Sequence, residues 1–163
     1  MSKYHMGNKD REINDEKIIQ DILNNGKYTT IALSNNKQPY IVTLSYGYDP
    51  ENKCLYFHCS NKGYKLDIIK NNPNACATII EDHGYVINDC SHKYRSLIIW
   101  GNLHKIEDIN EKEHAFDVMF AHLEKDNKTI KSQSFKDPST YDKVCVLKLN
   151  IDAIDAKGNV KPE

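Results

Sequence analysis

Between residues 28 and 59 the sequence alternates apolar and polar side chains in three short runs, and this pattern constrains the fold more than any other feature. Successive side chains of a β-strand point to opposite faces of a sheet, so residues 28–33, 40–46 and 54–59 are predicted to be strands. The connecting residues 35–38 and 49–52 are too few for the helical crossover that a parallel pair requires. The sequence therefore predicts an antiparallel meander and a mainly β fold.

Apolar residues elsewhere predict three more strands and three helices. The strands are expected at residues 75–81, 94–106 and 143–151. The helices are expected from residue 14 or 15 to 24, at about 61–71, and from 110 through 123. Gly26 and Pro73 stand where the first two helices would end, and Asn110 with Glu113 resembles a capping box. The polar stretch 127–140 is expected to be a loop.

Six short strands with three peripheral helices predict a small closed or partly closed antiparallel barrel, because closure removes exposed sheet edges. No repeat and no linker rich in Pro, Gly or Ser divides the 163 residues. A single domain is therefore expected over residues 1–163, with residues 1–9 as a flexible tail.

The overall charge and the cysteines narrow the class of protein. The formal net charge is −1 and the isoelectric point is near 6.6, so no bulk positive field favours nucleic acid or an anionic membrane. Five cysteines without a CxxC pair are unlike a secreted disulfide scaffold. Residues 1–7 lack the apolar core of a signal peptide, and the longest aliphatic-aromatic run, 97–100, is too short to span a bilayer. We expect a cytoplasmic protein.

Lys62 and Lys65 are the most informative charged residues. Both are expected in the first turn of the second helix, on one face, where the helix dipole disfavours cations. A phosphate between them would satisfy both ammonium groups and the free N–H groups of the helix end. Ser60 could add a hydroxyl, and Gly63 would allow close approach of the backbone. The alternative is a pair of solvated surface lysines.

Two side chains at the end of the preceding predicted strand could serve the same ligand. His58 could donate a hydrogen bond to a ligand, or it could be an ordinary partly buried histidine. Cys59 could be a plain buried thiol, or a reactive one if the helix N-terminus lowers its pKa.

The longest predicted strand carries Arg95 and Ser96 at its start and the single tryptophan, Trp100. An arginine that enters an apolar strand needs an anionic partner, which is either a ligand phosphate or a structural carboxylate. Trp100 is either part of a core or interface, or a stacking platform for a ligand.

A metal site is the competing chemical hypothesis. His83, Cys90 and His92 fall in one predicted loop and include the side chains that bind zinc or iron. The spacing of Cys90 and His92 matches no standard closed site, so we expect no metal.

Taken in order, several segments resemble those of the pyridoxamine-phosphate-oxidase-like split barrels, in particular their nitroimidazole-resistance reductase branch. The segments are Pro39-Tyr40-Ile41-Val42-Thr43-Leu44, Leu55-Tyr56-Phe57-His58-Cys59-Ser60, Lys62-Gly63-Tyr64-Lys65, Asn72-Pro73 and Tyr94-Arg95-Ser96-Leu97-Ile98-Ile99-Trp100-Gly101. The resemblance covers roughly residues 9–151.

This resemblance implies a six-stranded antiparallel Greek-key split barrel, with two protomers back to back and one FMN in each of two clefts between them. The strand carrying Ile41, Val42, Thr43 and Leu44 would lie along the flavin ring. The candidate cofactor contacts are Ile41, Val42, Thr43, Leu44, His58, Cys59, Ser60, Lys62, Gly63, Lys65, Arg95, Ser96 and Trp100. His58 is the candidate catalytic residue.

The implied function is an FMN-dependent oxidoreductase that takes electrons from NAD(P)H and reduces a nitro-aromatic or quinone-like molecule, with FAD as an alternative cofactor. The branch often has an aromatic residue before the Tyr-Arg-Ser motif, where this chain has residues 90–93, and residues 125–140 could lengthen a loop near the cleft. Two other functions stay open. One is a flavin-binding redox sensor without turnover, and the other is a haem- or metal-binding split barrel that uses His58, His83 or His92.

Overall fold

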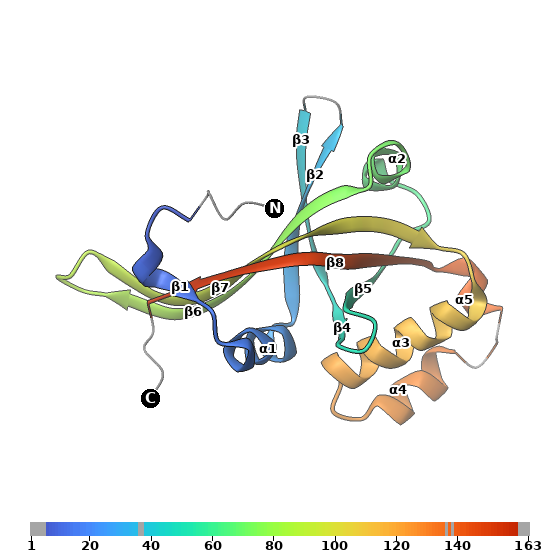
Figure 1. The fold of residues 1–163 in the computed structure, drawn as a ribbon. Helices are drawn as coiled ribbons and strands as arrows, with labels where there is room; N and C mark the ends of the chain where they lie inside the picture. Colours follow the sequence, from blue (N-terminus) through green and yellow to red (C-terminus); the bar gives the residue numbers. More distant parts are fainter. Residues whose placement is uncertain (1–5, 36–37, 136, 138, 160–163) are drawn as a thin grey trace.

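The chain folds around one antiparallel sheet of eight strands with helices packed against it (Figure 1). This computed structural model describes residues 6–35, 38–135, 137 and 139–159. The strands are β1 (Glu12–Ile13), β2 (Tyr28–Asn35), β3 (Gln38–Ser45), β4 (Gly47–Asp49), β5 (Cys54–Cys59), β6 (Asn74–Val86), β7 (Ser91–Ile106) and β8 (Cys145–Gly158). Their order is β3–β2–β6–β7–β8–β5–β4, and β1 pairs with the far end of β8.

Five α-helices and a short 3-10 turn at Lys9–Arg11 complete the described chain. The helices are α1 (Glu16–Asn25), α2 (Tyr64–Asn71), α3 (Ile109–Leu123), α4 (Asn127–Ser134) and α5 (Thr140–Lys143). The first predicted helix is confirmed: the Asp15 carboxylate accepts a hydrogen bond from the Lys17 N–H, and Gly26 stands at the C-cap. Of the predicted flexible tail, residues 1–5 lie outside the described residues.

The core consists of two clusters on different sides of the sheet. The larger one lies inside the curved sheet, where Leu55, Leu97 and Ile99 have no exposed surface. The smaller one lies under α3 and includes Tyr56 and Phe116. Fully burying a side chain of this size stabilises the fold by roughly 1.5–3 kcal/mol. Strand β5 contributes to both clusters, because Leu55 points into the larger one and Tyr56, on the opposite face of the strand, points into the smaller one.

The mainly β antiparallel architecture is confirmed, but the predicted meander is wrong after its first hairpin. Strands β2 and β3 pair along their whole length, whereas β5 pairs with β4 and β8 instead of β3. Tyr46, between β3 and β4, is fully buried, and its hydroxyl donates to the Leu23 carbonyl, which anchors the chain where it leaves the first hairpin. β1 and β4 raise the number of strands from six to eight, and the sheet is curved but not closed, with β3 and β4 at its ends.

Strands β6 and β7 continue into a hairpin that projects away from the helices at the other end of the molecule (Figure 1). The predicted loop with His83, Cys90 and His92, between the strands expected at 75–81 and 94–106, is wrong. Tyr85 pairs with His92 and Val86 with Ser91 beyond a bulge in β6. The exposed side chains of Tyr85 and Ile87 lie on this hairpin. We call residues 82–92 the arm.

The predicted loop at residues 127–140 is also wrong over its first half, which forms α4. Asp126 caps this helix by accepting from the Thr129 N–H. Phe135 ends it and packs against Tyr141 and Phe116, with ring centroids 4.3 and 4.5 Å apart. Phe135 therefore attaches the end of α4 to α3 and α5. Residues 136 and 138 lie outside the described residues.

Helix starts differ by a few residues from the predictions. The N-cap of α3 is Asp108, whose carboxylate accepts from the Glu111 N–H, so the predicted capping box at Asn110 is wrong. Helix α2 begins at Tyr64 instead of residue 61. The shift in α2 changes the position of one of the two lysines discussed above.

Candidate functional site

The start of α2 forms a compact basic site, which we call the anion cradle and define as Ser60, Lys62, Gly63 and Lys65. Gly63 is the N-cap at φ 141°, a conformation that strains any residue with a Cβ. Lys62 therefore precedes the helix, and the prediction that it lies in the first turn is wrong, whereas Lys65 does lie there. The Lys65 Nζ comes within 3.9 Å of the position that a Cβ on Gly63 would take.

The polar groups of the cradle are largely free of internal partners. Helix α2 has no side-chain hydrogen bond at its N-cap, and Ser60 Oγ accepts only a long hydrogen bond, 3.4 Å, from the Lys62 N–H. Within the described residues neither Lys62 nor Lys65 pairs with a carboxylate. Two cations and free N–H groups at a helix N-terminus are the elements of an anion-binding site.

The β2–β3 hairpin is held against the cradle by aromatic and polar contacts. The Tyr40 ring of β3 meets the Tyr64 ring edge-on, with centroids 5.3 Å apart. Asn35 donates a hydrogen bond of 3.1 Å to the Tyr64 hydroxyl. The structure thus brings β3, which carries Ile41, Val42, Thr43 and Leu44, next to the residues predicted to bind phosphate.

Half of the predicted contacts in β3 face outward. Ile41 is 64% exposed and Thr43 is also exposed, whereas Val42 and Leu44 pack against the core. The outward face continues across β2, β6 and β7, and we call it the outer face. A groove of about 490 Å³ in it is lined by Thr30, Ala32, Ile41, Cys76, Ala77, Thr78, Ile80, Tyr94, Ser96, Ile98 and Lys157.

Ser96 and Trp100 both belong to this outer face. Ser96 is buried at the floor of the groove. Trp100 is half-buried, stands opposite Cys76 of β6, and donates from Nε1 to the Asp155 carboxylate at 2.9 Å. Ile41, Thr43, Ser96 and Trp100 therefore share one surface, which is apolar with a few hydroxyls.

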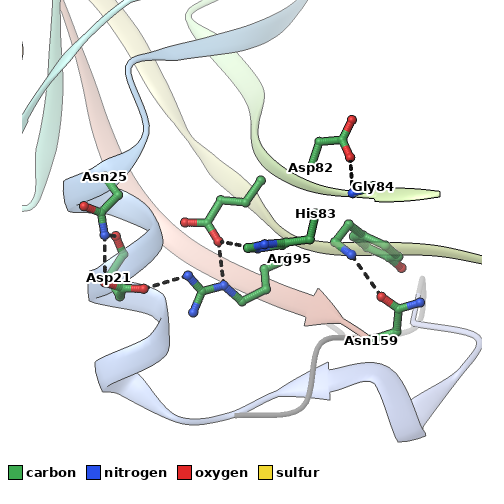
Figure 2. Close-up of polar contacts among 9 residues, drawn as sticks. Asp21, Asn25, Asp82, His83, Gly84, Arg95 and Asn159 are labelled. Carbon is green, nitrogen blue, oxygen red and sulfur yellow. Dashed lines mark hydrogen bonds and ion pairs between the residues drawn. The ribbon is translucent and has the colours of Figure 1, made fainter. Parts of the chain in front are cut away.

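Arg95 points to the opposite side of β7 and is bound by two carboxylates. Its Nε donates to Glu81 at 2.5 Å and its Nη2 donates to Asp21 of α1 at 2.7 Å (Figure 2). These hydrogen bonds raise the pKa of Arg95 above its ordinary value, and the bond with Glu81 has the largest effect. Of the two anionic partners considered for Arg95, the structure therefore shows carboxylates of the protein itself. It does not bring Arg95 to the cradle.

A hollow of about 530 Å³ lies beside Arg95, between the N-terminal segment and the end of β8. Its lining includes Asp10, Glu12 and Asp15 as well as Arg95. Because the arginine is already neutralised and the other charges are mostly acidic, this hollow is a poorer anion site than the cradle.

His58 and Cys59 point to opposite faces of β5. The exposed His58 ring lies 5.9 Å from the ring of Phe116 in α3, centroid to centroid. Cys59 turns toward the main core and stands opposite Cys145 of β8. The pKa of the Cys59 thiol is lowered to about 7. Hydrogen bonding with the neighbouring Cys145 thiol is the main cause and the Lys65 cation adds to it, whereas burial acts in the opposite direction.

The three candidate metal ligands lie on the arm and are not brought together. His83 Nε2 is 3.4 Å from Glu81, and His92 Nε2 is 2.7 Å from Asp82. The hydrogen bond with His92 lowers the pKa of Asp82. Across the described ranges there is no group of three or more His, Cys, Asp and Glu side chains arranged to hold a metal ion.

Comparison with known proteins identifies the family of this chain. Residues 15–158, nearly the whole chain, match the family described as pyridoxamine 5'-phosphate oxidase. The chain belongs to this family. The family resemblance predicted from the motifs is confirmed, and the curved antiparallel sheet is the family's split barrel.

Solved structures from three organisms share the fold. A Bacteroides thetaiotaomicron protein, provisionally described as a 5-nitroimidazole antibiotic resistance protein, is 28% identical with a TM-score of 0.76 and covers 90% of this chain and 85% of its own. A Mesorhizobium loti FAD-binding protein is 17% identical, with a TM-score of 0.67 and coverage of 92% and 98%. A Mycobacterium smegmatis FAD- and haem-binding protein is 16% identical, with a TM-score of 0.71 and coverage of 94% and 76%.

A search of curated proteins gave no match. In the part of this family member that the structure describes, no helix has the length and apolarity needed to cross a membrane.

Sequence reasoning missed the residues that hold the site together. Tyr40 and Tyr64 join β3 to the cradle, Cys145 lies against Cys59, and Phe116 packs against His58. Tyr40 and Tyr64 fall within the family motifs, so their aromatic character was a usable signal. The partners of Cys59 and His58 depend on long-range strand and helix packing, which no local pattern in the sequence shows.

Proposed function

We propose that this protein is a flavin-dependent oxidoreductase that binds FMN between two copies of the chain and reduces a small organic molecule. The observation that supports this most strongly is the position of the anion cradle beside an exposed, largely apolar strand. A flavin nucleotide has the matching parts, namely a phosphate and a flat, largely apolar ring system, joined by a polar ribityl chain.

The cradle supports binding of the phosphate end. A phosphate near Gly63 could accept from the free N–H groups at the start of α2 and from the ammonium groups of Lys62 and Lys65. Each hydrogen bond to a charged group contributes roughly 1.5–3 kcal/mol, so these contacts can outweigh the cost of taking the phosphate out of water. A single terminal phosphate matches one cradle, which favours FMN over FAD.

The outer face supports association of two copies. Ile41 and Ile80 are 64% and 62% exposed, and they line one groove with Ile98 and Ala32. Contiguous apolar surface of this kind marks an interaction site, and a self-complementary patch favours a two-fold symmetric dimer. Pairing through this face would also cover Ser96, Thr43 and Trp100 and would exclude water from a flavin ring beside β3.

The chemistry of the reaction would come mainly from the cofactor. When bound, a flavin would supply hydride acceptance from a nicotinamide and electron transfer to a second molecule. This chain would hold the phosphate at the cradle, orient the ring along β3 and keep the cleft dry. His58 is the side chain we propose to supply a proton to the reduced substrate.

The relatives support the cofactor and the substrate class. Two of the described structures are of FAD-binding proteins, and the one with 28% identity is linked by its description to 5-nitroimidazole resistance. We therefore propose nitro-aromatic or quinone-like acceptors and NAD(P)H as the donor.

The first test is the visible absorbance spectrum of the purified full-length protein, with mass identification of whatever denaturation releases. A flavin spectrum with released FMN, and oxidation of a nicotinamide when a nitro-aromatic or quinone is added, would support the proposal. Bound flavin without turnover would favour a flavin-binding sensor. A colourless protein that does not bind added FMN would refute the flavin assignment.

A further inference from the structure

Two thiols from strands that are distant in sequence stand side by side at the end of the sheet. Cys59 is the last residue of β5 and Cys145 the first of β8, and they are direct partners in the antiparallel register. In the same register Lys53 stands opposite Ile151, and the Ile151 N–H donates to the Lys53 carbonyl. Hydrogen-bonded and non-hydrogen-bonded pairs alternate along antiparallel strands, so the pair of Cys59 and Cys145, six positions along, is also a hydrogen-bonded pair. Such pairs have Cα atoms about 5.5 Å apart, within the Cα range of a disulfide, and their Cβ atoms must approach by up to about 1 Å for the bridge to close.

Because they are direct cross-strand partners, the two side chains point to the same face of the sheet. Cys145 is fully buried and Cys59 is half-buried. The charged groups that face this pair are cations from three elements: Lys65 of α2 beside Cys59, and Lys105 of β7 and Lys112 of α3 toward Cys145. A thiolate at Cys59 is therefore stabilised by its partner and by positive charge.

The remaining cysteines have different surroundings. Burial raises the pKa of Cys54 to about 11 and also raises that of Cys76. Cys90 is exposed on the arm. Of the cysteines, all of which lie in the described ranges, only Cys59 combines a lowered pKa of about 7, partial exposure and a second thiol within reach.

We propose that Cys59 and Cys145 form a reversible oxidative modification site, in which a hydroperoxide converts the two thiols into a disulfide between β5 and β8. The Cys59 thiolate attacks a peroxide oxygen, the O–O bond breaks, and the alcohol or water leaves with one proton. Cys145 sulfur then attacks the sulfur of the sulfenic acid at Cys59, and water leaves with the thiol proton. Two thiols and one hydroperoxide give one disulfide, one alcohol or water, and one further water.

This inference stands on the strand register and does not depend on the proposed flavin function. The bridge would join β5 to β8 immediately before Ser60, so it would fix the strand end from which the cradle begins. A thiol reductant would restore both cysteines.

The test uses the reduced full-length protein, treated with hydrogen peroxide, blocked with a maleimide and digested without reduction. We expect the mass map to contain a linked peptide pair joining Cys59 to Cys145, which disappears after reduction. Cys145→Ser should leave Cys59 as a sulfenic acid that dimedone traps, and Cys76→Ser should form the bridge as the parent does. Before oxidation, maleimide at pH 7 should modify Cys59 at least about tenfold faster than Cys54.

Three results would overturn the proposal: Cys59 unmodified in the peroxide-treated parent protein, Cys59 oxidised to sulfinic acid without any bridge, or bridges formed only through Cys90 between molecules. The peptide map of the parent protein needs no substitution, so it decides the question even if Cys145→Ser does not fold.

Discussion

Two basic regions of this protein lie in family motifs, but only one of them has carboxylate partners among the described residues. Arg95 is enclosed by Glu81 and Asp21 and is electrostatically satisfied (Figure 2). Lys62 and Lys65 surround a helix N-terminus and have no carboxylate partner among the described residues. The comparison teaches that a cation in a motif indicates a ligand only where the protein itself does not neutralise it. Arg95 is thus assigned to stability, and the lysines remain the proposed binding residues.

The largest expected effect is on the unpartnered lysines. Replacing both Lys62 and Lys65 with Ala should weaken FMN binding by about 100-fold or more, because each charge-assisted hydrogen bond is worth roughly 1.5–3 kcal/mol. The unfolding free energy should change little. Fluorescence titration of FMN and denaturant unfolding measure the two quantities. Lys70→Ala, in the last turn of the same helix, is the matched control and should bind FMN as the parent does.

The opposite pattern is expected for the partnered arginine. Arg95→Ala should lower the unfolding free energy by about 2–3 kcal/mol, because it removes two charged hydrogen bonds and leaves the Glu81 carboxylate with only its longer contact to His83. Chemical denaturation measures this loss, and Arg11→Ala on the exposed N-terminal turn is the control. A large loss of FMN affinity in folded Arg95→Ala would contradict the assignment of Arg95 to stability.

The outer face provides a third, intermediate test. Ile80→Glu should convert the proposed dimer to a monomer, since it places a carboxylate in an apolar interface, and it should weaken FMN binding at the same time. Sedimentation equilibrium measures the assembly state. Ile109→Glu, an exposed isoleucine on α3, should leave it unchanged. A monomeric parent protein, or a dimer that tolerates Ile80→Glu, would contradict the assignment of this face.

The smallest effect concerns another internally satisfied group, His122. Burial lowers its pKa, while its Nε2 bonds to the Gly26 carbonyl at 2.6 Å. A histidine kept neutral by the fold is protonated more readily when unfolded, so its stabilisation is complete above pH 6.5 and is lost as the pH falls below that value. Unfolding measured at pH 7.5 and at pH 5.5 should show a smaller difference in His122→Gln than in the parent. An equal difference in the two proteins would exclude His122 as a source of the pH dependence of the unfolding free energy.

The features that sequence predicted correctly are those encoded by neighbouring residues. The first helix follows from an apolar stripe with Asp15 and Gly26 at its ends. The motif of Lys62, Gly63 and Lys65 brought three residues of the proposed cradle to one helix start, but it did not show that Lys62 precedes the helix. Local spacing did not reveal that Arg95 bonds to Asp21, which is 74 residues away. It also did not reveal α4, because its order depends on the packing of Phe135 against residues of α3 and α5.

Strand neighbours were the hardest feature to predict. Three consecutive strands predict a meander, but the buried Tyr46 directs the chain to the other end of the sheet, and β5 pairs with the C-terminal strand. The contact between Cys59 and Cys145 follows from this pairing alone. Likewise, alternation showed that β3 has two faces but did not show which of them the core covers.

The most direct test of the central claim, that the cradle holds a flavin phosphate, compares FMN with riboflavin, which lacks the phosphate. Both are titrated into the flavin-free full-length protein and into the Lys62→Ala, Lys65→Ala double variant. Our account predicts that the parent binds FMN at least about 100-fold more tightly than riboflavin and that the double variant loses most of this preference. Equal affinity of the parent protein for the two flavins would contradict it.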